Sequence, residues 1–169
     1  MGLREEIDGR DVREVSRLLA EGANVNEKLE YDQTYLHWAS NRGLVEIAKV
    51  LIKYGANVNA QATNGTTPLY WAVSEMENAK THHQDPAKNK CALELIDLLL
   101  KSGADPNLRF ANEYCSALEL AKAYGQLDAV KLLVAREPPS EKALGHDLSA
   151  TKPAEEVRKD KRPWWKFWA

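Results

Sequence analysis

A nine-residue phrase, Leu-Leu-x-x-Gly-Ala-Asn-Val-Asn, constrains the fold of this chain more than any other feature. It runs from Leu18 to Asn26, and a close copy runs from Leu51 to Asn59, 33 residues later. A third copy, with Asp-Pro in place of Asn-Val, covers residues 99–107. A fixed period of this length is typical of repeat proteins, in which each unit packs on its neighbours in one long stack. The sequence therefore predicts a solenoid, and the functional question becomes which partner it binds.

A second motif recurs with the same period and marks helix starts. Residues 34–39 read Thr-Tyr-Leu-His-Trp-Ala and residues 67–72 read Thr-Pro-Leu-Tyr-Trp-Ala, with a weaker copy at 116–121. The leading Thr is typical of a helix N-cap, because its side-chain oxygen accepts a hydrogen bond from a free backbone N–H group. A Pro directly after it, as at position 68, loses nothing by lacking an N–H group.

The segments between these motifs have the period of a helix. Apolar residues form one face over residues 45–51 and 95–99. Gly22, Gly55 and Gly103 stand where a helix commonly ends in a left-handed residue. The Asn and Asp residues beyond each Gly are turn formers. We therefore expect an all-α fold, a solenoid of helix-turn-helix units joined by hairpin-like loops.

The order of these features resembles the ankyrin repeat over about residues 4–137. That family's unit has a Thr-Pro-Leu-His-x-Ala motif, a Gly, an apolar run and a closing Gly-Ala-x-x-Asn. The resemblance implies an ankyrin-repeat solenoid in which the motif His joins neighbouring repeats by hydrogen bonds, and so a structural role for His37. Tyr70 and Glu119 stand at the His position of the next two units, which predicts an incomplete hydrogen-bond network between repeats.

Four units fill the predicted repeat domain, residues 1–137, and a tail follows it. The units cover about residues 1–26, 27–59, 60–107 and 108–137, and the tail covers residues 138–169. The first unit is degenerate, as expected for an end repeat whose outer face has no neighbour. It consists of a short charged segment, Leu3 to Asp8, and a helix over residues 12–21. The last unit lacks the closing Gly-Ala, and a Pro-Pro pair ends its final helix.

The third unit holds 15 more residues than the second, within about residues 74–91. An Asp-Pro pair in this insertion predicts a new helix start. We expect the first helix of the unit to continue to about Lys80, then a loop at 81–85 and a long second helix from Pro86 to Lys101. Both helices would project beyond the stack at the end opposite the hairpins. The insertion is either a neutral loop, which solenoids tolerate, or an addition to the binding face.

The tail is basic and rich in tryptophan. Seven Lys or Arg residues against five Asp or Glu residues give it a net charge of +2, whereas the whole chain carries −2. Its aromatic cluster consists of Trp164, Trp165, Phe167 and Trp168. Three interpretations are open: the cluster folds back onto the last repeat, docks into a partner, or makes weak contact with a membrane surface. The membrane ranks third, because one short anchor binds a membrane weakly.

Composition argues against several classes of protein. No apolar run is long enough for a transmembrane helix, and the charged first ten residues predict no secretion signal. Cys91 and Cys115 lack the spacing of a disulfide framework, which favours a reduced, cytoplasmic protein. A net charge of −2 argues against a nucleic-acid partner.

Motifs that carry catalysis are missing from the sequence. It has no Gly-rich phosphate loop, no Gly-x-Ser-x-Gly and no His-Glu-x-x-His. His82, His83 and Cys91 do not have the spacing of a zinc site, and a solvated polar loop accounts for them. We therefore expect a protein that is not an enzyme and holds no metal or cofactor.

Proteins with this resemblance generally bind other proteins with a concave surface, which consists of hairpin tips and the exposed edges of the first helices. The family's variable surface positions, with Phe110 beside them, correspond here to Glu30, Tyr31, Gln33, Asn41, Arg42, Thr63, Asn64, Thr66, Ser74, Glu75, Phe110, Asn112, Glu113 and Tyr124. The aromatic residues and Arg42 are the first to test, because aromatic and Arg side chains dominate binding hot spots.

These observations predict a monomeric, cytoplasmic adaptor or inhibitor that binds another protein. Small stand-alone members of the resembled family include inhibitors, immunity partners of bacterial toxins, and effectors. The alternative is a membrane-peripheral scaffold that is anchored by the tail.

Overall fold

The computed structural model describes residues 2–78, 86–109 and 116–135, and within these ranges the chain is helical without a strand. The helices are α1 (Leu3–Asp8), α2 (Val12–Ala20), the short 3-10 helix η1 (Glu30–Asp32), α3 (Tyr35–Asn41), α4 (Val45–Lys53), α5 (Pro68–Asn78), α6 (Pro86–Lys101), α7 (Ala117–Ala123) and α8 (Leu127–Val134). The predicted all-α solenoid of helix-turn-helix units is confirmed.

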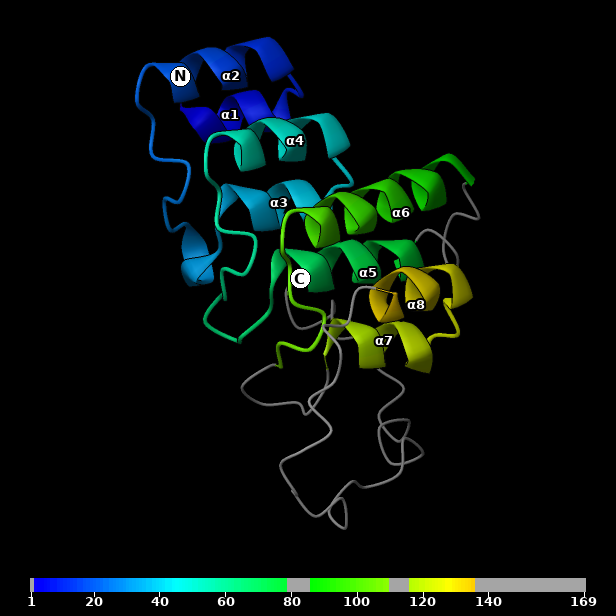
Figure 1. Cartoon of the computed structure of the whole chain (residues 1–169). Coiled ribbons are helices and arrows are strands. Elements are labelled where there is room, and N and C mark those ends of the chain that lie inside the picture. The colour runs from blue at the N-terminus through cyan, green and yellow to red at the C-terminus, as the bar shows by residue number, and fades with distance from the viewer. Residues whose placement is uncertain (1, 79–85, 110–115, 136–169) are drawn as a thin grey trace. The chain divides into compact units, whose positions relative to one another are not determined.

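Consecutive helices form pairs, and the pairs stack into two layers (Figure 1). The inner layer consists of α1, α3, α5 and α7, and the outer layer consists of α2, α4, α6 and α8. In the inner layer α3 packs on α5 and α5 on α7, while in the outer layer α2, α4, α6 and α8 pack in sequence. All of these helices belong to a unit that spans residues 1–138.

Side chains close the starts of α5 and α7, and the cap at Thr67 is the one that the sequence predicts. The Thr67 hydroxyl accepts the N–H of Tyr70 at 3.2 Å, and Pro68 is the first residue of α5. The Ser116 hydroxyl accepts the N–H of Glu119 at 3.3 Å, and the Glu119 carboxylate accepts the N–H of Ser116 at 2.7 Å. These bonds satisfy backbone donors that have no partner inside the helix, so the motif sets where α5 and α7 begin.

The inner helices bury the motif alanines. Ala39, Ala72 and Ala121 are fully buried, and so are the motif leucines Leu36 and Leu69. A methyl group takes little room, so a buried alanine lets neighbouring helices pack closely. Buried side chains from all eight α-helices join into one hydrophobic core.

The repeated Asn residues form a ladder along the loops. The side-chain amide of Asn26 donates to the carbonyl of Gly55 at 3.0 Å, and its oxygen accepts the backbone N–H of Asn57 at 2.8 Å. Asn59 makes the same two bonds with the Gly103 segment, at 2.9 and 2.8 Å. Gly55 and Gly103 have φ values of +88° and +91°, which end α4 and α6 in the left-handed residue that the sequence predicts. The phrase therefore recurs because each copy binds the next.

The first repeat is a complete helix pair. The segment from Leu3 to Asp8, predicted only as a charged stretch, forms the six-residue helix α1. A helix of this length is not stable alone in water. Burial of Leu3 and Ile7 against the core supplies the stability that the isolated segment lacks.

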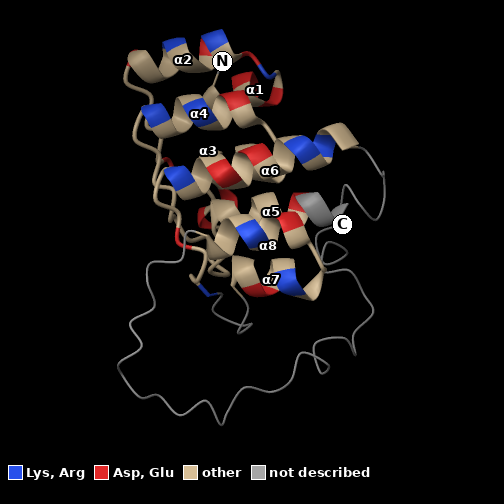
Figure 2. Ribbon diagram, turned by 45° about the vertical axis from the view of Figure 1, so that its right-hand side comes forward, with Lys and Arg blue, Asp and Glu red and all other residues tan. Residues whose placement is uncertain are grey.

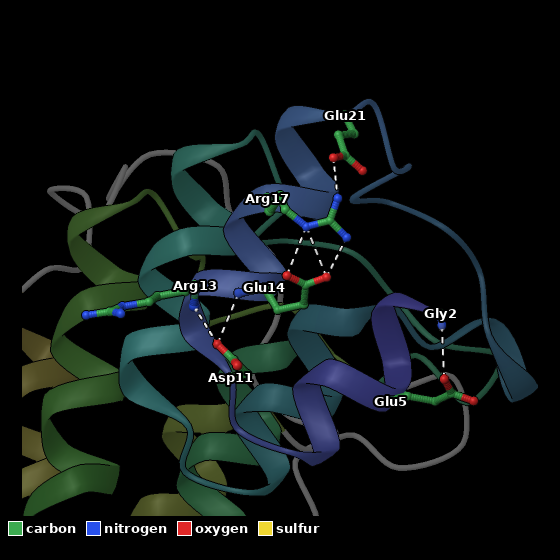
Figure 3. A network of polar contacts seen from close by, with 7 residues as sticks. All are labelled: Gly2, Glu5, Asp11, Arg13, Glu14, Arg17 and Glu21. Carbon is green, nitrogen blue, oxygen red and sulfur yellow. Dashed lines mark hydrogen bonds and ion pairs between the residues drawn. The ribbon is translucent and has the colours of Figure 1, made fainter.

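Polar contacts cover the start and the outer face of α2 (Figure 3). The Asp11 carboxylate caps this helix by accepting the backbone N–H groups of Arg13 and Glu14 at 3.0 and 3.1 Å. The Arg17 side chain donates from Nε to the Glu14 carboxylate at 2.9 Å and also pairs with Glu21. A polar outer helix suits an end repeat.

The insertion in the third unit lengthens its helices. α6 has 16 residues, whereas α4 has nine, so α6 extends roughly 10 Å further at 1.5 Å per residue. Its bounds, Pro86–Lys101, are the predicted ones. α5 is described to Asn78, and the predicted continuation to Lys80 and the loop at 81–85 lie outside the described residues. Figure 1 shows α6 projecting beyond α4 at the end away from the hairpins.

Charges of both signs lie along the outer helices (Figure 2). Lys49 pairs with Glu46 at 2.6 Å on α4, and Lys101 pairs with Asp97 at 2.5 Å on α6. These exposed pairs add little stability, since water screens them.

Candidate protein-binding surface

The loop before α3 is a tight hairpin whose tip exposes an aromatic side chain. Its ends are joined by a bond from the Leu29 N–H to the Gln33 carbonyl at 2.7 Å. At the tip, Tyr31 and Asp32 have φ values of +60° and +57°, the left-handed region that side chains other than glycine seldom adopt. The Tyr31 side chain is 55% exposed.

The next hairpin lies beside the first and is bonded to it. Its Thr63 N–H donates to the Tyr31 carbonyl at 2.8 Å, and the Thr63 hydroxyl donates to the Asp32 carboxylate at 3.2 Å. Lys28 pairs with the same carboxylate at 3.2 Å. This ion pair lowers the pKa of Asp32, and the hydrogen bond from Thr63 lowers it further by a smaller amount. This second hairpin places Gly65 at its positive φ of +79°, where glycine causes no strain. The two tips therefore form one ordered edge of the inner layer.

His37 joins the second repeat to the third. The side chain is 1% exposed, its Nδ1 accepts the Thr34 N–H at 3.0 Å, and its Nε2 lies 3.0 Å from the Thr66 carbonyl. These partners assign the proton to Nε2, which donates to Thr66. Burial lowers the pKa of His37 to about 4, so the ring is neutral near neutral pH. The bridge that the family resemblance predicts for this residue is confirmed.

A cluster around Trp38 joins the first repeat to the second. The Trp38 indole N–H donates to the Asp8 carboxylate at 2.8 Å, and Arg42 Nη1 donates to the same oxygen at 2.7 Å. The guanidinium carbons of Arg4 and Arg42 lie 4.8 and 4.5 Å from the centre of the indole, within cation–π range. Arg4 also lies 4.0 Å from the Glu30 carboxylate.

Arg42 is among the surface residues predicted from the sequence, whereas Arg4 and Asp8 are not. Their spacing of four residues puts both side chains on one helix face. The four-residue spacing indicates a shared face only if residues 3–8 form a helix, and a segment of six residues is too short to predict a helix from its sequence.

The structure places the predicted surface residues in three groups. The exposed residues are Glu30, Tyr31, Asn41, Arg42, Thr63, Asn64 and Tyr124, and the half-buried ones are Gln33 and Glu75. Thr66 and Ser74 are buried, so their side chains support the surface without offering area to a partner. The Thr66 hydroxyl, for example, donates to Asn64 at 2.7 Å inside the hairpin.

The remaining predicted residues lie outside the described part of the chain. They are Phe110, Asn112 and Glu113 in the last hairpin and Trp164, Trp165, Phe167 and Trp168 in the tail. His82 and His83 also lie outside it. Among the described residues no group of three His, Cys, Asp or Glu side chains could hold a metal ion. None of the helices in the described part of the chain is both long and apolar enough to cross a membrane.

Comparison with known protein families agrees with this architecture. A model of three consecutive ankyrin repeats matches residues 8–82, and a model of a single ankyrin repeat matches residues 64–110. No curated protein matches the sequence. Ankyrin repeats generally mediate protein–protein interaction, and proteins built from them are typically not catalytic. With its two-layer helical stack, its bridging His37 and its Asn ladder, the chain belongs to the ankyrin-repeat family.

Proposed function

We propose that this chain is a non-catalytic adaptor or inhibitor that binds a protein partner through the hairpin tips and the exposed edge of its inner helices. The observation that carries the proposal is the tip of the first hairpin. Tyr31 holds a left-handed backbone there with its side chain exposed. Strain of this kind costs about 1 kcal/mol or more and is often kept where a side chain has a function.

The neighbouring hairpin supports this argument. By the 33-residue period its Gly65 corresponds to Asp32, and Asn64, which corresponds to Tyr31, has no positive φ, so the fold does not require a left-handed residue at the Tyr31 position to make such a loop. Glycine or asparagine in place of Tyr31 would serve the first hairpin with less strain. A large exposed aromatic side chain at this point is therefore better explained by recognition than by stability.

The proposed binding surface is also ordered in advance. The hairpin tip is bonded to Thr63 of the next hairpin, and Arg42 is held by Asp8 and Trp38. Side chains and loops that are already fixed lose less entropy on binding, which raises affinity. Tyr124, 41% exposed in the last repeat, would extend the same surface along the stack.

The test is a double variant, Tyr31→Ala with Tyr124→Ala, used as bait for partner capture from native lysate. We expect capture to fall by at least tenfold, as loss of two hot-spot side chains would produce, with helical content unchanged. Lys49→Ala with Lys53→Ala, on the exposed outer face, is the matched control and should capture normally. Full capture by the tyrosine variant would show that the partner binds elsewhere.

A further inference from the structure

Two arginines from different repeats flank one indole on the inner layer. Arg4 comes from α1 and Arg42 from the end of α3, and each guanidinium carbon lies within 5 Å of the Trp38 ring. The two guanidinium groups are therefore at most about 9 Å apart. Their side chains are 45% and 43% exposed, so both reach solvent.

Both guanidinium groups have donors to spare. A guanidinium has five N–H donors. Within the described part of the chain Arg42 gives one of them to Asp8 at 2.7 Å. Besides its contact with the indole, Arg4 forms an ion pair with Glu30, and 4.0 Å is too long for a hydrogen bond.

The cluster is built to hold these donors in place. Asp8 accepts from both the indole and Arg42, and so fixes the ring and the second guanidinium together. Stacking on the indole limits the motion of both arginines. A partner that binds them therefore meets donors whose orientation is already set.

Two carboxylates face the arginines and have different roles. Asp8 is engaged by two hydrogen bonds and serves as the support of the cluster. Glu30 is a weak competitor, since its side chain is 78% exposed and touches Arg4 only at 4.0 Å. An incoming carboxylate would displace Glu30 at little cost, because an exposed ion pair contributes little.

We propose that the Arg4–Trp38–Arg42 cluster recognises an acidic segment of the protein partner, in which two carboxylates lie two to four residues apart. Carboxylates are the groups that guanidinium donors bind best, often through two parallel hydrogen bonds. Alternate residues of a strand stand roughly 7 Å apart and residues on successive turns of a helix roughly 6 Å apart, and both distances lie within the upper limit on the separation of the two guanidinium groups. The inference rests on the proposed function and names the chemistry of the partner.

Selection from a random peptide library displayed on phage, with the full chain as bait, tests this inference. We expect the selected peptides to be enriched in paired Asp or Glu residues at that spacing. Fluorescence anisotropy then measures the binding of one selected peptide and of its copy with Gln in place of the acidic residues. Binding should weaken about tenfold in Arg4→Gln or Arg42→Gln and in the Gln peptide. Arg42→Lys keeps the positive charge but lacks the paired N–H donors of a guanidinium group, so its affinity for the peptide should lie between those of the native chain and Arg42→Gln.

Two further variants make the result specific. Arg13→Gln, at an exposed position of the outer helix α2, should bind as the native chain does. Glu30→Gln should bind about twofold more tightly, because it removes the competitor of the incoming carboxylate.

Selected peptides without acidic pairs, or unchanged affinity in both Arg variants, would overturn the inference. A lower melting temperature with unchanged peptide binding would assign the cluster to packing between repeats alone, which also overturns it. In either case partner capture that still depends on Tyr31 and Tyr124 would leave the proposed function standing. If partner capture does not depend on Tyr31 and Tyr124 while acidic peptides still bind as expected, the result counts against the hairpin tips as the binding surface and leaves the acidic-segment inference standing.

Discussion

Replacement of Asn59 by Ala tests whether the Asn ladder couples the repeats. The Asn59 amide donates to the Gly103 carbonyl at 2.9 Å and accepts the Asp105 N–H at 2.8 Å, so the substitution removes two bonds between the second and third repeats. Gly103 and Asp105 are exposed, and water takes over the freed groups. Each bond then contributes its net value of about 1 kcal/mol. We expect the free energy of unfolding to fall by about 2 kcal/mol, and the melting temperature by about 7 °C for a unit of this size.

Urea unfolding followed by circular dichroism measures this change, as a shift in midpoint at constant slope. Gln61→Ala is the matched control, because Gln61 also has an amide in this loop region but is exposed and makes no hydrogen bond within the described residues. Its effect should stay below about 0.5 kcal/mol.

Asn59→Asp separates the two bonds. Aspartate keeps an acceptor for Asp105 N–H but turns a carboxylate oxygen toward the Gly103 carbonyl, so the donor bond is lost and two oxygens meet. We expect a loss of at least about 1 kcal/mol. Equal unfolding midpoints for Asn59→Ala and Gln61→Ala would refute the reasoning, since the ladder would then contribute nothing to coupling.

Three other predictions concern single side chains. Burial lowers the pKa of His37 from 6.5 in the unfolded chain to about 4, so the native state resists protonation. The contribution of His37 to the free energy of unfolding is complete above pH 6.5, and about 3 kcal/mol of it is lost as the pH falls to about 4. Urea titrations across that range should show this slope in the native chain and lose it in His37→Gln. Tyr31→Asn should raise the unfolding free energy by about 0.5–1 kcal/mol by relieving strain while it weakens partner capture; a loss of stability would contradict the strain argument. Val45→Ala should cost about 1–2 kcal/mol because Val45 is 8% exposed, whereas Leu127→Ala at the equivalent position of the last repeat should cost under about 0.5 kcal/mol because Leu127 is 70% exposed; equal losses in thermal unfolding would be the contrary result.

Local signals in the sequence located most helix ends correctly. Thr67 with Pro68 starts α5, and Pro86 starts α6 at the predicted residue. Gly55 and Gly103 end their helices in left-handed conformations. Caps and helix stops depend on hydrogen bonds that span only a few residues, so a short stretch of sequence contains all that is needed to read them.

Exposure of the candidate surface was less predictable. Family positions placed Thr66 and Ser74 on the binding face, yet both are buried. Burial depends on which side chains from other repeats cover a position, and a repeat pattern does not state how far each hairpin leans over its neighbour. The same limit applies to α1, whose six residues become a helix because Leu3 and Ile7 find a core to enter.

The sequence by itself determined the repeat, its period and the all-α solenoid, because these follow from local caps, glycines and one apolar face per helix. Only the tertiary structure decided which residues meet across repeats. Asp8 and Trp38 are 30 positions apart, and Asn26 and Gly55 are 29 apart. Such contacts require helices of different repeats to be stacked in register, so which residues meet is set by the packing of the whole unit.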